Sequence, residues 1–360
     1  MPELSELLTH LAERRGSDLI IKVGSAPHLR IDGHLTASDL PALAPSDIEE
    51  ILAELLPVQK AEELMDRGEV DVAHGIPGVG RFRINVFRQR GSLGMAVRRV
   101  VPGAPAIADL HLPAAVEKLA MEESGLIVVA GSAASGKTTT VAAVLDHVNS
   151  TRARHIVTIE DPIEVLLADK ESLISQREVG SDAPSVAAAM RRVGRQNADV
   201  IFVSDVTDAA TAEAVVSEAL AGRLVIVSMP ALSATETIPR LVDLFPPHLQ
   251  RQARYSLGNV LKGVVVQRLL DRVDGRGRVP AVEVLIGTQK VSEAIASGAD
   301  EQTLEALMRE GEYHGMQTFD QALLSLYQDM VISVRDAVSA AARPEDLRIA
   351  MQHAGMAAAY

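Results

Sequence analysis

The feature that most limits what this chain can fold into is one eight-residue segment. Residues 131–138 read Gly-Ser-Ala-Ala-Ser-Gly-Lys-Thr and match the G-x-x-x-x-G-K-[ST] pattern of a phosphate loop. The apolar run at residues 126–130 predicts a buried strand before it, and the valines and leucine of residues 141–148 have the spacing of one helix face after it. The segment therefore predicts a strand, loop and helix that bind a nucleotide.

The chemistry of such a loop assigns a task to each part of it. Backbone N–H groups wrap the phosphates, and the N-terminus of the following helix adds a favourable dipole. Lys137 is expected to reach the β- and γ-phosphates, and the Thr138 hydroxyl to ligate Mg²⁺, so ATP and Mg²⁺ are the predicted ligands. The predicted nucleotide-binding residues here are Gly131, Ser132, Ala133, Ala134, Ser135, Gly136, Lys137, Thr138 and Thr139. A chance Gly/Ser/Ala turn is the alternative, and the strand and helix around the segment argue against it.

Composition narrows the class of protein further. The 360 residues are enough for two domains, and 47% hydrophobic with 23% charged residues is ordinary for a globular protein. The absence of cysteine excludes disulfides, thiolate zinc sites and cysteine nucleophiles, and the net charge of −13 argues against nucleic acid as a partner. No apolar stretch approaches a membrane span, and the N-terminal residues lack a signal-peptide pattern. These features predict a cytoplasmic protein without a transmembrane segment.

The pattern of predicted elements changes along the chain. The first part mixes helices with strands and turns, which indicates an α+β domain with a small antiparallel sheet, whereas the later part alternates strands and helices, which indicates an α/β domain with a parallel sheet. The predicted organisation is residues 1–102, an N-terminal domain; 103–110, a linker; 111–290, a nucleotide-binding domain; and 291–360, a helical region with a loosely ordered Ala-rich tail from residue 351.

Local sequence patterns predict two further features. A helix is expected at residues 47–56 with Ser46 as its N-cap. From residue 247 onward the pattern is mostly helical, apart from a strand-like run at residues 281–286.

Two acidic residues follow predicted strands of the parallel sheet. Ligands of open parallel sheets bind beyond the carboxyl ends of the strands, so these residues are candidates for the site. Glu160 is predicted to be the general base for the attacking water, the alternative being a turn or capping acid before Pro162. Asp205 is predicted to act in catalysis and in holding Mg²⁺, the alternative being a turn aspartate.

Arginines concentrate in the first domain. The alternation Arg81, Phe82, Arg83, Ile84 places both arginines on one face of a strand. Spacing alone supports two interpretations equally, namely arginine fingers that act across a subunit interface and a solvated strand surface. The ten histidines show no metal-ligand spacing.

Several long segments match the motifs of one known family. They are Pro-Gly-Val-Gly-Arg-Phe-Arg-Ile-Asn-Val-Phe at residues 77–87, the phosphate loop, His-Ile-Val-Thr-Ile-Glu-Asp-Pro-Ile-Glu at 155–164, Ser-Gln-Arg-Glu-Val-Gly at 175–180, Thr-Ile-Pro-Arg-Leu-Val-Asp-Leu-Phe-Pro at 237–246 and Gly-Met-Gln-Thr-Phe-Asp at 315–320. On these segments the chain, from about residue 4 to about residue 338, resembles the PilT/PilU group of type IV pilus retraction motors, within the hexameric secretion ATPases.

The resemblance implies a PAS-like N-terminal domain, a RecA-like P-loop ATPase domain, and a ring of six subunits with ATP held between the two domains. It implies that Glu160 is the catalytic glutamate and that Arg81, Arg83 and Arg99 contact the nucleotide. It further implies work on an inner-membrane platform protein, at which this cytoplasmic chain would be peripheral, and a role in pilus retraction and twitching motility. The ring could be a homo-oligomer or be mixed with a paralogous motor.

The sequence departs from the family in its Walker B segment and its His box. The family's Gly-Glu-Met-Arg-Asp stands here as Ser-Asp-Val-Thr-Asp at residues 204–208, so the carboxylate of Asp205 is one methylene shorter. Arg223 and Pro230 stand where the family has two histidines, and proline has no titratable group. Loss of one electrostatic stabiliser typically costs about 10²–10³ in kcat. Nucleotide binding is expected to persist, while turnover is expected to be weak.

The sequence is compatible with three functions. One is a retraction-type ATPase, and the second is a catalytically impaired accessory or regulatory subunit that co-assembles with an active motor. The third, a small-molecule kinase, leaves the first domain unexplained.

Overall fold

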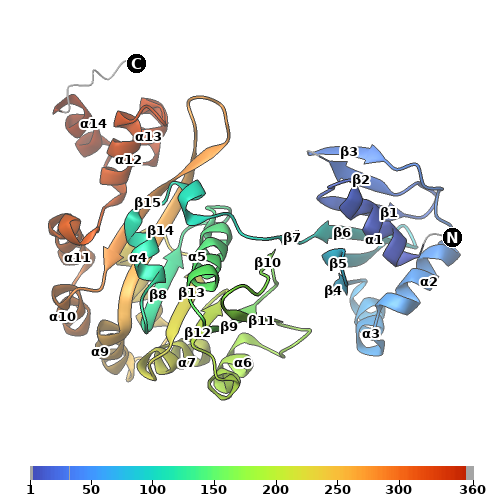
Figure 1. Cartoon of the computed structure of the whole chain (residues 1–360), viewed down its shortest axis with the longest axis horizontal. Coiled ribbons are helices and arrows are strands. Elements are labelled where there is room, and N and C mark those ends of the chain that lie inside the picture. The colour runs from blue at the N-terminus through green and yellow to red at the C-terminus, as the bar shows by residue number, and fades with distance from the viewer. Residues whose placement is uncertain (1–2, 32, 354–360) are drawn as a thin grey trace. The chain divides into compact units, whose positions relative to one another are not determined.

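The structure is a computed structural model that describes residues 3–31 and 33–353. The chain divides into two compact units (Figure 1). Unit 1 comprises Met1–Gly103 with Glu164–Leu166, and unit 2 comprises Ala104–Ile163 with Leu167–Tyr360. The predicted linker, residues 103–110, begins at this division, but it contains a short 3₁₀ helix, η1 (Ile107–Leu110), whose Ile107 is buried in a core of unit 2.

Unit 1 is built on an antiparallel sheet of six strands in the order β3-β2-β1-β6-β5-β4. Its elements are α1 (Leu4–Glu13), β1 (Asp18–Lys22), β2 (His28–Ile31), β3 (His34–Ala37), α2 (Pro45–Leu55), α3 (Val58–Arg67), β4 (Glu69–Ile76), β5 (Gly80–Gln89) and β6 (Ser92–Arg99), with β7 (Val101–Pro102) paired in parallel to β10 (Val165–Leu166). The predicted α+β class with an antiparallel sheet is confirmed.

The core of unit 1 follows from simple periodicity. Leucines three and four positions apart bury one face of α1, and alternate residues of β5, namely Phe82, Ile84 and Val86, are fully buried. The predicted N-cap of α2 is wrong. The helix begins at Pro45 after Ala44, and the Asp47 carboxylate accepts a hydrogen bond from the Ala44 N–H at 2.7 Å. Proline is favoured at the first helical position, so the helix starts before Ser46 instead of after it.

Unit 2 contains a seven-stranded sheet in the order β11-β9-β12-β13-β8-β14-β15, parallel except for the last pair. Its elements up to the sheet edge are α4 (Ala114–Ala120), β8 (Gly125–Ala130), α5 (Lys137–Thr151), β9 (His155–Glu160), β11 (Leu173–Glu178), α6 (Val186–Val193), η2 (Gly194–Gln196), β12 (Val200–Val203), α7 (Ala209–Leu220), β13 (Leu224–Met229), α8 (Ala234–Asp243), α9 (Gln250–Val260), β14 (Leu261–Asp271) and β15 (Arg278–Ile286). The predicted α/β class and parallel sheet are confirmed.

The mostly helical pattern predicted from residue 247 is wrong at β14. This strand pairs in parallel with β8 and antiparallel with β15, so its central residues, Val264, Val265 and Val266, are inaccessible to solvent. A continuous apolar run covered on both faces has no period of two, and it cannot be told from a buried helix by pattern alone.

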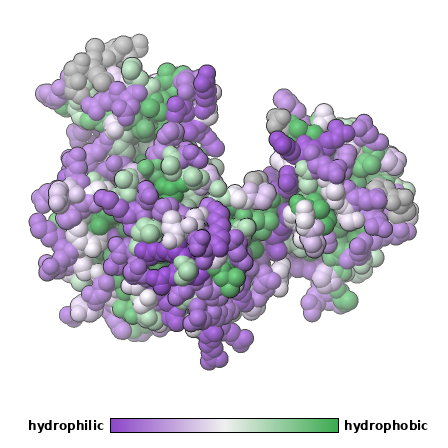
Figure 2. All heavy atoms as spheres, in the orientation of Figure 1, coloured by the Kyte–Doolittle hydropathy of each residue, from purple (hydrophilic) through white to green (hydrophobic). Residues whose placement is uncertain are grey.

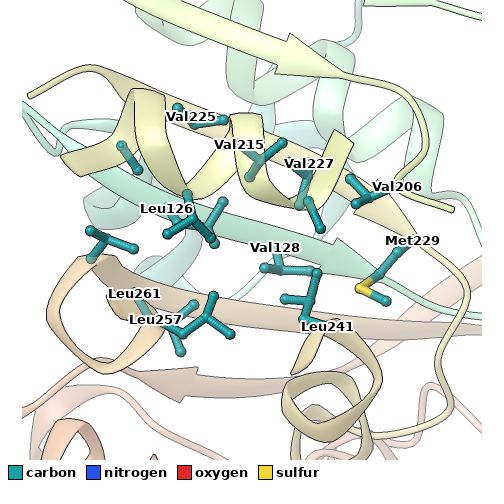
Figure 3. Close-up of a cluster of buried hydrophobic side chains, with 14 of the residues drawn as sticks. Leu126, Val128, Val206, Val215, Val225, Val227, Met229, Leu241, Leu257 and Leu261 are labelled. Carbon is teal, nitrogen blue, oxygen red and sulfur yellow. The ribbon is translucent and has the colours of Figure 1, made fainter. Parts of the chain in front are cut away.

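Two hydrophobic cores cover the two faces of this sheet. On one face Leu126 and Val128 of β8 lie among Val215 of α7, Leu241 of α8 and Leu257 of α9 (Figure 3). On the other face, β8 packs against α4 and α5. Because β8 has a buried strand on either side and helices above and below, the loop that leaves its carboxyl end has a rigid base.

The C-terminal region is helical. It comprises α10 (Gln289–Ser297), α11 (Glu301–Glu310), η3 (Gly311–His314), α12 (Phe319–Gln328), α13 (Val334–Ala340) and α14 (Pro344–His353). The last three helices form a small core with Val279 and Ala281 of β15. Met351, the first residue of the predicted loose tail, lies in α14 and is 1% exposed, while residues 354–360 of that tail lie outside the described residues.

Hydrophilic residues cover most of the visible face of each unit, with apolar residues in small patches (Figure 2). In the part of the chain that the structure describes, no helix combines the length and the apolar character needed to cross a membrane.

Candidate functional site

The loop between β8 and α5 requires glycine at both ends. Gly131 has a φ of 152°, and a Cβ there would lie 2.4 Å from Ser135 Oγ and 2.6 Å from the backbone oxygen of Gln267. Gly136, the N-cap of α5, has a φ of 90°, and its Cβ would lie 2.8 Å from Gln267 Nε2. Backbone at these positions is packed too closely for any side chain. Between them, Ala134 is held at a φ of 59°, in the left-handed region that a non-glycine residue rarely adopts.

The cation of the loop is held by the loop itself. Lys137 Nζ donates hydrogen bonds to the carbonyl oxygens of Gly131 at 2.9 Å and of Ser132 at 2.7 Å. Ser135 Oγ is buried and, within the described residues, has no hydrogen-bond partner. A buried hydroxyl, a lysine over the loop and the first turn of α5 are groups that a phosphate would satisfy, so the residues present fit a bound nucleotide.

Gln267 on β14 is a contact of the loop that the sequence did not indicate. Its side chain is 1% exposed, its Nε2 donates to the Ser135 carbonyl at 2.8 Å, and its Oε1 accepts from Thr140 Oγ1 at 2.8 Å. One amide thus joins the loop to the first turns of α5. The contact spans more than a hundred residues, and β14 itself was not predicted, so no local signal could have found it.

Glu160 is the last residue of β9 and is 6% exposed. Its Oε1 accepts hydrogen bonds from Thr158 Oγ1 at 2.6 Å and from Gln176 Nε2 at 3.0 Å. These partners come from β9 itself and from β11, so the carboxylate is held against the sheet.

Asp205 lies two residues after β12. Burial raises the pKa of Asp205, while the N–H of Val206 and the charge of Lys137 lower it and the charge of Asp161 raises it again. The Asp161 N–H also donates to Ser204 Oγ at 3.0 Å, so the carboxyl ends of β9 and β12 lie together, as expected for parallel strands. Asp205 Oδ1 also accepts from the Val206 N–H at 2.9 Å, so the turn contact of the alternative interpretation is present as well.

The two residues at the His-box positions lie at opposite ends of β13. Pro230 directly follows the strand at its carboxyl end, and its carbonyl accepts from Arg240 Nη1 at 2.6 Å. Arg223 precedes the strand, where it forms an ion pair with Glu218 at 2.5 Å and donates to the carbonyl of Ala198. Arg223 is therefore at the amino end of β13, whereas the phosphate loop follows the carboxyl end of the parallel strand β8.

The three predicted arginines belong to unit 1. Arg81 and Arg83 alternate on β5 with buried Phe82 and Ile84, and so share the other face, as predicted. Arg99 on β6 is paired in register with Phe82. Directly paired residues share a face, so Arg99 lies on the face opposite Arg81 and Arg83.

For the metal, Thr138 in the first turn of α5 and Asp205 are the predicted oxygen donors. His, Asp and Glu side chains do not gather in groups of three or more suited to a metal ion anywhere in residues 3–31 and 33–353. Two donors of this kind fit Mg²⁺, which is usually bound by one or two protein oxygens together with nucleotide phosphates and water.

The parallel sheet, the glycine-bounded loop after β8 and the lysine at the start of α5 define a RecA-like P-loop nucleotide-binding protein. Residues 111–331 match the sequence profile of the family described as "Type II/IV secretion system protein". The chain is 33% identical to the type IV pilus ATPase PilU of Pseudomonas aeruginosa, with 96% of this chain and 91% of that protein covered. It is also 33% identical to the retraction ATPase PilT of the same organism, with 96% and 99% covered.

The fold comparison agrees with these sequence matches. A crystal structure of the pilus retraction motor PilT with bound ADP superposes with a TM-score of 0.86 at 38% identity, covering 96% of this chain and 99% of that one. The chain therefore belongs to the type II/IV secretion system protein family, within its PilT/PilU group of type IV pilus ATPases.

Proposed function

We propose that this chain is a retraction-type ATPase of a type IV pilus, which binds ATP with Mg²⁺ through residues 131–139. The single observation that carries the binding half is the loop after β8, with two glycines that admit no side chain and Lys137 above it. The similar PilT was solved with ADP, which supports the choice of nucleotide. When bound, Mg²⁺ would neutralise charge on the phosphates.

The chain's own residues divide the remaining tasks. Lys137 exchanges its contacts with the loop carbonyls for contacts with phosphate oxygens. Thr138 and Asp205 would hold the metal, and Glu160 would accept the proton of the attacking water. The bonds from Thr158 and Gln176 support that role for Glu160, because they fix the orientation of its carboxylate at the carboxyl end of β9. Arg81, Arg83 and Arg99 supply positive charge to the nucleotide, in the same or a neighbouring subunit.

The assembly and partner follow from the resemblance. The chain acts as a ring of six, made of one kind of subunit or mixed with a paralogous motor. It works from the cytoplasmic side on the platform protein of the pilus machine at the inner membrane, and it drives pilus retraction and twitching motility. A chain that stays monomeric with ATP and Mg²⁺ at micromolar concentration would contradict the ring.

Steady-state ATP hydrolysis by the purified chain tests the catalytic half. Turnover that Glu160→Gln lowers by about a hundredfold or more would support the motor. Binding of ATP, measured by calorimetry, should be lost in Lys137→Ala and retained in Glu160→Gln. Lys118→Ala, on α4, is the matched control for removing a lysine.

A second function is favoured by one observation. Asp205 is one methylene shorter than the glutamate of the family motif, and its Oδ1 is turned to its own neighbour Val206. This favours a subunit that binds ATP without useful turnover and regulates an active motor with which it co-assembles. Asp205→Glu separates the two functions. If the parent chain does not hydrolyse ATP and Asp205→Glu does, the chain is an impaired subunit. If the parent chain already hydrolyses ATP, it is a motor.

A further inference from the structure

Two adjacent residues of β14 make contacts in different directions. Gln267 holds the phosphate loop through Ser135 and Thr140, as described above. Arg268, the next residue, donates from Nη1 to the carbonyl of Ala340 at 2.9 Å and from Nη2 to the carbonyl of Leu232 at 3.1 Å. Since successive side chains of a strand point to opposite faces, β14 lies between the loop on one side and these two carbonyls on the other.

The contacts of Arg268 reach the C-terminal helices. Ala340 is the last residue of α13, and the guanidinium also stacks 4.4 Å from the ring centre of Phe319, the first residue of α12. A planar guanidinium with two carbonyls and a ring fixes position more tightly than a single contact would. Arg268 thus connects β14 to both α12 and α13.

The same side chain also holds the segment that follows β13. Leu232 lies between Pro230 and the start of α8, and Glu283 of β15 accepts a hydrogen bond from the Ala234 N–H at 2.6 Å. Glu283 is directly paired with Val266 of β14, one residue before Gln267. The end of β13, the start of α8 and the two C-terminal helices therefore all depend on the position of one short piece of β14.

Nucleotide binding must disturb the contact between β14 and the phosphate loop. Lys137 is bonded to two carbonyls of its own loop and has to leave them to reach phosphates. Ser135, whose carbonyl Gln267 holds, lies in the same loop two residues away. Packed elements shift as units when a neighbour moves, because interiors have few voids to absorb a displacement.

We propose that Gln267 and Arg268 couple nucleotide binding at the phosphate loop to the packing of the C-terminal helices α12 and α13. Gln267 is the positioning residue for the loop, and Arg268 carries its position to the helices. This inference rests on the proposed nucleotide binding and goes beyond it. It assigns the residues through which the nucleotide-bound state affects α12 and α13, two helices far from the phosphate loop in sequence.

Hydrogen–deuterium exchange of the full chain with and without ADP and Mg²⁺ tests the coupling. In the parent, ADP should slow exchange both at residues 131–140 and at residues 319–340. In Arg268→Met, slowing at 131–140 should remain while that at 319–340 falls by about fivefold or more, a typical coupling factor. Arg272→Met, one residue after the end of β14 and paired with Asp274, should behave like the parent.

A second variant, at Gln267, tests the contact between β14 and the phosphate loop, and it keeps the proposal testable if the Arg268 variant misfolds. Gln267→Glu keeps an acceptor for Thr140 but places a carboxylate against the Ser135 carbonyl, so ADP should bind more weakly and the remaining protection of α12 and α13 should fall with it. Far-UV circular dichroism confirms folding. If Arg268→Met does not fold, Arg268→Lys, which keeps the charge without the fork, takes its place.

The outcomes are distinguishable. If ADP does not slow exchange at residues 131–140 of the parent, the proposed function and the coupling are both overturned. Protection at 131–140 without any at 319–340 in the parent would overturn the coupling alone. Equal protection of the helices in the parent and in the Arg268 variant would overturn the role of Arg268.

Discussion

The hydroxyl of Ser204 accepts a hydrogen bond from the backbone N–H of Asp161 at 3.0 Å, which ties the carboxyl end of β12 to that of β9. The two candidate carboxylates, Glu160 and Asp205, each adjoin one partner of this bond. The spacing between them therefore depends on a side chain that glycine, the residue of the family motif at this position, cannot supply.

We expect Ser204→Ala to lower the free energy of unfolding by about 0.5–1.5 kcal/mol, the usual net value of one hydrogen bond. Chemical denaturation of both proteins measures this. Ser217→Ala, at an exposed position of α7, should leave the value within about 0.5 kcal/mol of the parent. Equal values for the two variants would show that the Ser204 bond contributes nothing to stability.

Ala134→Gly should stabilise the chain, against the usual effect of introducing glycine. Ala134 has a φ of 59°, and the left-handed region costs a non-glycine residue about 1–2 kcal/mol. Glycine loses about 0.5–1 kcal/mol more backbone entropy on folding, so the net gain is about 1 kcal/mol or less. Ala133→Gly, in the same loop but outside the left-handed region, should instead destabilise. A loss of stability in both variants would contradict strain at Ala134.

Gly136→Ala and Gly222→Ala separate a steric clash from backbone strain. The two glycines have nearly the same φ, 90° and 92°, but a Cβ at Gly136 would lie 2.8 Å from Gln267 Nε2 and one at Gly222 meets open space. Both variants should lose about 1–2 kcal/mol through strain. Only Gly136→Ala should also weaken ATP binding, because Gln267 has to leave the Ser135 carbonyl. Equal ATP affinities would contradict the close packing of the loop on β14.

We expect the contribution of Glu283 to the free energy of unfolding to fall as the pH rises. Burial raises the pKa of Glu283 from 4.5 to about 7, against the opposing effect of the N–H groups of Ala234 and Phe319 and of Arg268. The folded chain therefore keeps this proton to a higher pH than the unfolded chain. Its contribution to the free energy of unfolding is complete below pH 4.5 and falls between pH 4.5 and about 7, by on the order of 3 kcal/mol.

Denaturation at a series of pH values, with Glu283→Gln beside the parent, measures this contribution. The amide still accepts a hydrogen bond but does not titrate, so the fall between pH 5 and pH 7 should be smaller in the variant. Glu293→Gln, on the exposed side of α10, is the control and should follow the parent. Parallel pH curves for the parent and Glu283→Gln would contradict the raised pKa.

The parts predicted from sequence are those set by local pattern. The apolar spacing and the glycines predicted the strand before Gly131 and the helix after Gly136. The alternation of strands and helices predicted that Glu160 and Asp205 lie at or just after the carboxyl ends of parallel strands. Tertiary contacts decided what was missed. The strand β14 is apolar because it is covered on both faces, and the roles of Gln267 and Arg268 exist only once it is paired.

The segment before α12 covers part of an outer strand edge against pairing with a strand of another chain. Gln317 exchanges backbone hydrogen bonds with Val284 at 2.9 and 3.0 Å, and its amide donates to the carbonyl of Val282 at 2.6 Å. β15 is an outer strand of the seven-stranded sheet, and exposed strand edges are templates for aggregation. Gln317 therefore engages the backbone groups of Val284 and the carbonyl of Val282, which a foreign strand would otherwise bind. Loss of the chain from residue 315 onward would remove α12 to α14 and uncover the apolar edge of β15, and the truncated protein would be prone to form intermolecular β-structure.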